Sequence, residues 1–267
     1  MCRFLEYSRS SFYKQRHRQP STRYQENRRL QEVIKEIYTQ SSGRYGSPRI
    51  TAALHHQGYV CNHKRVARLM RKMGLAAKLF RRYKVTTQSN HQQIRSANLL
   101  GGHFNSSRPN RIWTGDITYI RTAEGWLYLA AILDTYSRNI VGWDTSSRLH
   151  STLVEGALKI ALKNRSITPG MIFHSDQGIQ YARESLRKLL ERYGFQQSMS
   201  RRGNCYDNAI TESFFHTLKT EMVHRHRFNS RQEARTKIFE YIELFYNRNR
   251  LHSGIGYRSP VEYERLT

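Results

Sequence analysis

The sequence has few cysteines and few acidic residues, and it lacks a long hydrophobic run. Its three cysteines, Cys2, Cys61 and Cys205, lie far apart in 267 residues and fit neither a disulfide framework nor a zinc motif. Cys61 and His63 lack the further ligands that a zinc site needs. The longest apolar run, 126–133, is too short to cross a bilayer, and no apolar core follows the basic N-terminus. We therefore expect a cytoplasmic protein without a membrane partner.

Acidic residues are scarce beside basic ones. The chain has 45 Lys/Arg and 20 Asp/Glu, a formal net charge of +25 and a pI near 10.4, which favours a polyanionic partner. Residues 1–110 hold 22 Lys/Arg and 4 Asp/Glu, whereas residues 111–267 hold 23 and 16. The first part is predicted to bind nucleic acid, and the second, whose charge is more balanced, is predicted to form the enzyme domain. A ribosomal or histone-like protein is the alternative, but 17 tyrosines and a well-patterned second half argue against it.

The first part of the chain carries a helix-turn-helix pattern. A helix is predicted at 24–40, a second at 48–57 with Ser47 as its cap, and a third at 63–73 with Asn62 as its cap. The third helix should bury its apolar residues and expose a basic face, as major-groove binding requires. That face contains Lys64, Arg65, Arg68, Arg71 and Lys72. The alternative is a solvated surface on a small helical bundle.

Two acidic residues of the second part occur where strands bring side chains to the rim of a sheet. Asp116 lies within the apolar segment 111–120, and Asp176 follows the apolar run 171–175. Further strands at 126–133 and 140–143 and a helix at 151–165 give the element order of an α/β, ribonuclease H-like fold. In that fold the first and fourth strands are neighbours, so Asp116 and Asp176 should lie side by side.

A third acid, Glu212, falls on an amphipathic helix whose apolar residues recur every four positions, at Ile210, Phe214, Leu218 and Met222. Glu212 lies off this stripe, on the same side as Lys219, which we expect to hold a phosphate near the reacting bond. Three carboxylates with a lysine beside them suggest a metal site that handles phosphates.

Several other residues are candidates for supporting roles. His174 should share the side of Asp176, where it either orients a water or hydrogen bonds within the rim. Asn208 or Asp207 is expected to cap the helix of Glu212. Arg201 and Arg202 lie in a loop suited to gripping DNA, and Asp134 more plausibly caps a turn than contacts metal. The predicted organisation is a basic segment (1–22), a helix-turn-helix domain (23–76), a basic linker (77–108), the ribonuclease H-like core (109–222), and a C-terminal helix (230–247) with an extended tail (223–267 in all).

The chain closely resembles the catalytic, second-frame transposases of bacterial insertion sequences, in the group nearest to retroviral integrases. The resemblance covers almost the whole length, including GSPRITAALHHQGYVCNHKRVARLMRKMGL, WTGDITYI, HSDQGIQY, SMSRRGNCYDNAITESFFHTLKTE and YNRNRLHSGIGYRSP. Thirty-five residues separate Asp176 from Glu212, and Lys219 follows Glu212 by seven. Both spacings match that family's D-D-(35)-E pattern with its basic residue.

The resemblance implies an enzyme that cuts double-stranded DNA at the ends of its element and joins the freed 3′-OH to a target strand. Asp116, Asp176 and Glu212 would bind two Mg²⁺ ions, which Mn²⁺ could replace. Family members often act as a frameshifted fusion with an upstream-frame product, and they self-associate to synapse two ends. We expect the same partners here, with action at the bacterial nucleoid. The alternatives are a ribonuclease H- or resolvase-like enzyme that only hydrolyses, and a DNA-binding protein with an inactive site.

Overall fold

The structure is a computed structural model that describes the chain except residues 1–3, 5–7, 17–18, 78–95, 202–207 and 267. It divides into two compact units, Met1–Lys78 and Leu79–Thr267. The described end of the predicted linker belongs to the second unit, because the Leu99 amide donates to Ser198 Oγ and the Met199 amide donates to the Ala97 carbonyl. Among the described residues, no helix is both long and apolar enough to cross a membrane.

The first unit is helical, with α1 (Arg9–Arg16), α2 (Thr22–Gln40), α3 (Ser47–His56) and α4 (His63–Lys72). Helices α2, α3 and α4 bury an apolar core formed by Leu30, Ile34, Ile37, Ile50, Leu54, Val66, Leu69 and Met70. Asn62 caps α4 as predicted, its side chain accepting from the Lys64 amide. The prediction for α3 was wrong at its start. Gly46 is the N-cap, and Ser47 Oγ lies 2.9 Å from His63 Nε2, so Ser47 joins α3 to α4.

The second unit is built on a five-stranded sheet in the order β3-β2-β1-β4-β5. Strands β1 (Ile112–Thr122), β2 (Gly125–Asp134) and β3 (Ile140–Ser146) form an antiparallel meander. Strands β4 (Ile172–Ser175) and β5 (Gln196–Met199) continue the sheet in parallel. The predicted adjacency of the first and fourth strands is confirmed, because β4 pairs with the first four residues of β1. Strand β5 was missed from the sequence.

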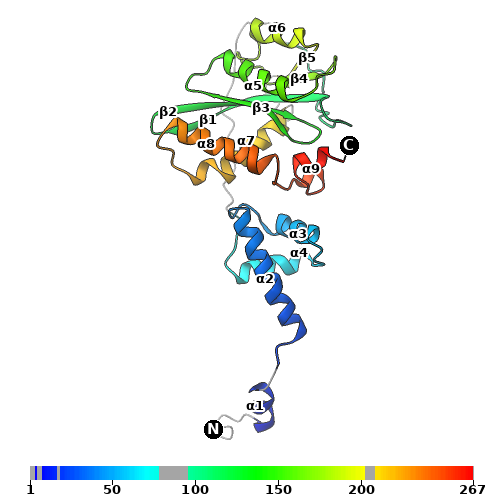
Figure 1. Cartoon of the computed structure of the whole chain (residues 1–267), viewed down its shortest axis with the longest axis vertical. Helices are drawn as coiled ribbons and strands as arrows, with labels where there is room; N and C mark the ends of the chain where they lie inside the picture. Colours follow the sequence, from blue (N-terminus) through cyan, green and yellow to red (C-terminus); the bar gives the residue numbers. More distant parts are fainter. Residues whose placement is uncertain (1–3, 5–7, 17–18, 78–95, 202–207, 267) are drawn as a thin grey trace. The chain divides into compact units, whose positions relative to one another are not determined.

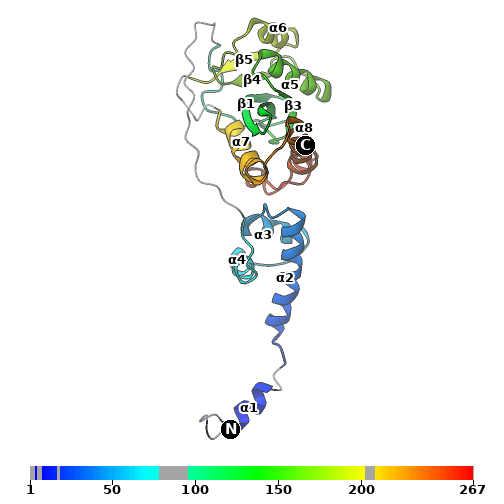
Figure 2. The same cartoon turned by 90° about the vertical axis from the view of Figure 1, so that its left-hand side faces the viewer.

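Helices cover both faces of the sheet (Figures 1 and 2). The sheet thus lies between two apolar cores. On one face, α5 (Ser151–Asn164) and α6 (Glu184–Arg192) enclose a core with Trp113, Ile132 and Phe173. On the other face, α7 (Ala209–Glu221) and α8 (Arg231–Phe239) enclose a core that includes Leu129, Phe214 and Ile238. The predicted C-terminal helix is α8 followed by a π-helical turn, Glu240–Tyr246.

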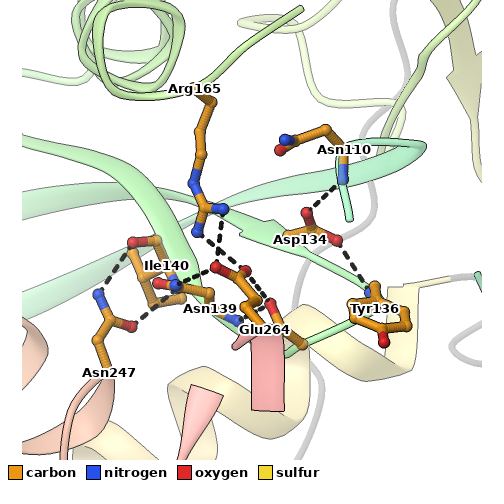
Figure 3. Close-up of polar contacts among 9 residues, drawn as sticks. Asn110, Asp134, Tyr136, Asn139, Ile140, Arg165, Asn247 and Glu264 are labelled. Carbon is orange, nitrogen blue, oxygen red and sulfur yellow. Dashed lines mark hydrogen bonds and ion pairs between the residues drawn. The ribbon is translucent and has the colours of Figure 1, made fainter. Parts of the chain in front are cut away.

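The prediction of an extended tail after this helix was wrong. Residues 247–266 fold back as a 3-10 turn (Ser253–Ile255) and α9 (Pro260–Glu264), which begins with a capping box at Ser259. Polar contacts over long sequence distances anchor this segment (Figure 3). Asn247 bonds the amide and the carbonyl of Ile140, and Glu264 forms a bidentate pair with Arg165 at 2.8 and 3.0 Å. The glycine and proline residues of this segment suggested an extended chain, but the segment is folded and packed against the rest of the second unit.

Candidate active site

Asp116 lies at the point where β4 ends beside β1. The register pairs Gly115 with Ser175, the last residue of β4. From Asp116 to Arg121 this edge of β1 has no strand partner in the described part of the chain. Gly115 leaves no room for a side chain, since a Cβ there would meet the Phe173 ring at 2.8 Å. The rings of Phe173 and Tyr181 thus pack against the backbone of Gly115, the residue that precedes Asp116.

Asp176 follows β4, so its carboxylate reaches the same edge of the sheet. Its side chain is exposed, and Oδ1 accepts a 2.9 Å hydrogen bond from the Gly178 amide. A Cβ on Gly178 would lie 2.9 Å from the same oxygen, which is closer than real Cβ contacts come. The short turn after β4 therefore holds the Asp176 carboxylate and requires a glycine two residues later.

Glu212 reaches the site from the other layer, in the first turn of α7. A buried hydrogen bond from Thr211 Oγ1 to Thr114 Oγ1, 2.7 Å long, joins α7 to β1. The predicted apolar stripe is confirmed, with Phe214, Leu218 and Met222 buried. Because Thr114 lies two residues before Asp116 and Thr211 directly precedes Glu212, this bond holds the segments that carry Asp116 and Glu212 against each other.

The electrostatics show that the three acids are neighbours. Burial, followed by the charges of Asp176 and Glu212, raises the pKa of Asp116 well above its ordinary value, while Lys219 opposes the shift. Burial and the charge of Asp176 also raise the pKa of Glu212. Asp116 and Glu212 are thus placed where burial and a neighbouring carboxylate disfavour the ionised form, which is the environment that a bound cation relieves.

The three side chains lie within electrostatic range of one another, but they do not converge as the ligands of one metal ion. Among the described residues, no group of three or more His, Cys, Asp or Glu side chains is drawn together tightly enough to hold a metal ion. Asp176 and Glu212 are both exposed, the first in the turn after β4 and the second in the first turn of α7. The donor chemistry is that of hard, oxygen-liganded cations.

Lys219 lies beside this carboxylate group. Burial lowers the pKa of Lys219, and the charge of the nearby Asp116 offsets only part of this shift. Its Nζ lies 5.0 Å from the centroid of the Tyr119 ring. Lys219 therefore brings a cation to the free edge of β1, next to Asp116.

The two residues expected to support the site have different environments. His174 is fully buried between β4 and β5, with Nδ1 2.8 Å from Ser198 Oγ and Nε2 3.2 Å from Ser200 Oγ. It hydrogen bonds within the rim directly before Asp176. Asn208 occupies the N-cap position of α7, but its side chain makes no capping bond, and its buried Oδ1 has no hydrogen-bond partner among the described residues. Asp207 lies outside those residues.

The basic residues expected to contact DNA are not all available for it. On α4, Lys64, Arg68, Arg71 and Lys72 are exposed. Arg65 is half-buried instead, with Nη2 2.9 Å from Glu26 Oε2 and Nε 2.9 Å from Asn27 Oδ1. It ties α4 to α2, which corrects the prediction that it points outward. Arg201 is exposed, and Arg202 lies outside the described residues.

Asp134 has a structural environment away from the three acids. It is buried and accepts from the amides of Asn110 and Tyr136 (Figure 3), so it caps the turn after β2. The glycine that follows Asp176 was readable in the sequence as the end of a strand, although its contact with the carboxylate was not. Sequence reasoning missed the pair Thr114 and Thr211, because their contact joins positions 97 residues apart.

Comparison with known proteins follows the same division of the chain. An HTH-like domain model matches residues 25–84, and integrase core domain models match residues 106–205 and 212–267. The chain is 45% identical to the transposase for insertion sequence element IS904 of Lactococcus lactis over 93% of this chain and 98% of that protein. It is 44% identical to the transposase InsF for insertion sequence IS3A of Escherichia coli K12, over 99% of this chain and 92% of that protein.

A solved structure is similar in fold. The integrase in a simian T-cell lymphotropic virus intasome superposes with a TM-score of 0.51 and 14% identity, over 86% of this chain and 74% of that one. The second unit is thus the mixed α/β, ribonuclease H-like core predicted from the order of its elements.

Proposed function

The chain belongs to the insertion-sequence transposases that carry an integrase core domain, and on this premise we propose that Asp116, Asp176 and Glu212 are its catalytic residues for DNA transposition. The observation that carries the proposal is that acidic side chains from β1, from the turn after β4 and from α7 lie within electrostatic range at one edge of the sheet. After the larger effect of burial, the charges of Asp176 and Glu212 raise the pKa of Asp116, and the charge of Asp176 raises the pKa of Glu212.

The donor set fits divalent cations, with Mg²⁺ as the natural ion and Mn²⁺ as its substitute. Carboxylate oxygens are the ligands that Mg²⁺ takes while keeping several waters, and burial together with the charges of Asp176 and Glu212 raises the pKa of Asp116, which a bound cation would offset. Asp116, Asp176 and Glu212 would together hold two ions. Such ions would neutralise charge on the attacking and leaving oxygens of an in-line phosphoryl substitution.

The chain's own groups position the DNA. Lys219 would bind a phosphate oxygen beside the scissile bond, because its cation lies within electrostatic range of Asp116. His174 keeps β4 and β5 together behind Asp176 through its two serine contacts. The buried contact between Thr211 and Thr114 holds α7, and with it Glu212, against β1.

The reaction exchanges one phosphodiester for another. Water first cleaves the element's 3′ end and leaves a 3′-OH. The oxygen of that hydroxyl then attacks a phosphorus atom of the target strand, the bond from phosphorus to the target's 3′ oxygen breaks, and the hydroxyl proton passes to solvent while the leaving oxygen gains one. No nucleotide cofactor is needed, since the bond that forms is similar in energy to the bond that breaks.

DNA binding is shared between the units. The HTH-like domain presents Lys64, Arg68, Arg71 and Lys72 on one helix, and we assign them to duplex DNA near the element's ends, with Arg201 contacting DNA beside the active site. Two ends must be brought together, so a multimer is the acting species. An upstream-frame product, joined as a fusion, would supply further end recognition on DNA in the bacterial cytoplasm.

The test is a strand-transfer assay with the element's own ends and a separate target duplex, in Mg²⁺ and in Mn²⁺. Asp116→Asn, Asp176→Asn and Glu212→Gln should each abolish cleavage and joining while DNA retention stays unchanged. Glu191→Gln, at an exposed acid on α6, should retain activity. Nicking equal to wild type in Asp176→Asn would reject the site. Cleavage without covalent joining to target would indicate a hydrolytic nuclease.

A further inference from the structure

An exposed aromatic pair lies on the free part of the β1–β2 hairpin. Tyr119 on β1 and Trp126 on β2 are 43% and 45% exposed, and their rings pack edge to face with centroids 5.2 Å apart. In the antiparallel register Tyr119 lies opposite Tyr128, and Trp126 lies opposite Arg121. All four side chains therefore occupy one face of the sheet. A large aromatic surface left in water on an enzyme is a candidate for ligand contact.

This pair is continuous with the proposed active site through Lys219. The Lys219 ammonium lies 5.0 Å from the Tyr119 ring centroid and within electrostatic range of Asp116. Asp116 and Tyr119 are three residues apart in one strand, about 10 Å along it, so their side chains leave opposite faces of β1 and Lys219 connects them around its free edge. At roughly 3.4 Å for each base step of a DNA strand, this span covers about three nucleotides.

The surroundings indicate what binds there. Arg121 is exposed beside Trp126, and Lys219 places a second basic group at the Tyr119 ring. Basic groups beside a flat apolar surface match a phosphate backbone whose base turns toward the rings. A protein partner with an apolar face would have to bury these two cations.

We propose that Tyr119 and Trp126 bind a nucleobase that is unpaired from the DNA within about three nucleotides of the scissile phosphate. The proposal rests on the proposed function, because it takes DNA at Asp116 as its reference point. A paired base offers the protein only its edges, so stacking on a ring requires unpairing, which costs a few kcal/mol. Stacking on an aromatic side chain returns roughly 1–3 kcal/mol per base.

The experiment couples a protein change to a DNA change. The full chain is assayed for cleavage and strand transfer on duplexes of its element's terminal repeat, either intact or with one abasic site at each of the first three positions flanking the cut, on either strand. Trp126→Ala should lower the rate on intact ends between roughly 5- and 150-fold, the range that loss of one stacking contact gives. Trp126→Phe should recover most of it. Tyr193→Ala removes an aromatic ring that is equally exposed, at 43%, but lies at the end of α6, and it should change nothing.

The decisive comparison is between wild type and Trp126→Ala on abasic ends. Wild type should slow markedly at one abasic position and not at the others. At that position Trp126→Ala should lose no further activity, since the contact is already absent. Independent, multiplying losses would overturn the proposal, as would a wild type indifferent to every abasic site. The proposed function itself is tested in the same assay, because it requires an active wild type and an inactive Asp176→Asn variant. If that requirement fails, the proposed function is wrong; if it holds, the abasic comparison tests the stacking contact alone. Thermal unfolding of each variant excludes loss of fold as the cause.

Discussion

At the scale of single residues, the carboxylate of Asp176 depends on the absence of a side chain at Gly178. The Gly178 amide donates to Oδ1, and a Cβ on that glycine would lie 2.9 Å from the same oxygen. Gly178→Ala should therefore displace the carboxylate and lower strand cleavage on the order of 10- to 100-fold, since a misplacement of about 1 Å has effects of this size.

The matched control for this change is Gly254→Ala, because Gly254 has open space where its Cβ would stand. Both variants should keep the unfolding temperature of the wild type, and only Gly178→Ala should lose activity in a nicking assay. Full activity of Gly178→Ala in Mg²⁺ would show that the turn after β4 does not position Asp176.

The raised pKa of Asp116 makes a prediction about stability without metal. Below its ordinary value near 3.8 this acid is protonated in both the folded and the unfolded chain. As the pH rises through the window between that value and the raised one, only the unfolded chain releases the proton, so the free energy of unfolding falls. Asp116→Asn should therefore unfold at a higher temperature than wild type at neutral pH without metal, and this advantage should vanish below about pH 4.

Added Mg²⁺ supplies the control for this prediction, because it should raise the unfolding temperature of wild type more than that of Asp116→Asn. The two measurements together separate repulsion among the acids from a general effect of substitution. Identical pH profiles for wild type and variant would contradict the electrostatic account of the site.

At the scale of elements, the docking of α7 on β1 depends on one hydroxyl pair. Thr211 Oγ1 donates to Thr114 Oγ1 at 2.7 Å in a buried environment. Thr211→Val or Thr114→Val leaves the partner hydroxyl buried and unsatisfied, so each should lower the free energy of unfolding by about 1–3 kcal/mol. The double variant should lose less stability than the sum of the two single losses, because it contains no hydroxyl that is left without a partner. Denaturant unfolding measures this coupling, and strictly additive losses would show that the bond contributes little.

The contact between α9 and α5 gives a second prediction for an element. Glu264 accepts from Ser137 and Asn139 and forms a bidentate pair with Arg165, both partners being 17% exposed (Figure 3). Glu264→Ala leaves the Arg165 guanidinium without its carboxylate and should cost about 2–4 kcal/mol. Denaturant unfolding checks the loss.

The exposed pair of Glu184 and Lys188 within α6 supplies the control for α9, and Glu184→Ala should leave stability unchanged. If Glu264→Ala unfolded at the same denaturant concentration as wild type, α9 would not be held by this cluster.

How far the sequence predicted these elements depends on the range of the contacts that form them. Asp116 beside Asp176 followed from element order, and the burial of Phe214 and Leu218 followed from helical periodicity, because both are local patterns read against a known topology. Strand β5 (Gln196–Met199) was missed because it is short and polar, and the hydroxyl of its Ser198 finds its partners, His174 and the Leu99 amide, far away in the sequence. The packed C-terminal segment was missed for the same reason, since its partners lie about 100 residues away.

At the scale of the whole molecule, charge is distributed unevenly between a basic first part and a more balanced second part, with 22 Lys/Arg in residues 1–110 against 4 Asp/Glu. Not every basic residue contributes equally to DNA binding. Arg65 and Arg68 lie on the same helix, but Arg65 is committed to Glu26, whereas Arg68 is exposed. Replacing either residue by alanine removes one positive charge, so the two variants have the same formal charge and differ only in the role of the lost cation.

Arg68→Ala should reduce the slope of log K against log salt concentration for duplex DNA by about 0.9 in magnitude, the contribution of one neutralised phosphate. Arg65→Ala should leave that slope unchanged and instead lower the unfolding temperature of the first unit, because α4 loses its tie to α2. Fluorescence anisotropy with terminal-repeat and random duplexes over a series of salt concentrations gives both slopes. Equal slope changes for the two variants would mean that charge alone governs binding, and that the exposed face of α4 has no specific place on the DNA. A loss confined to the terminal repeat would instead assign Arg68 to base contact, because phosphate contacts weaken binding to every sequence alike.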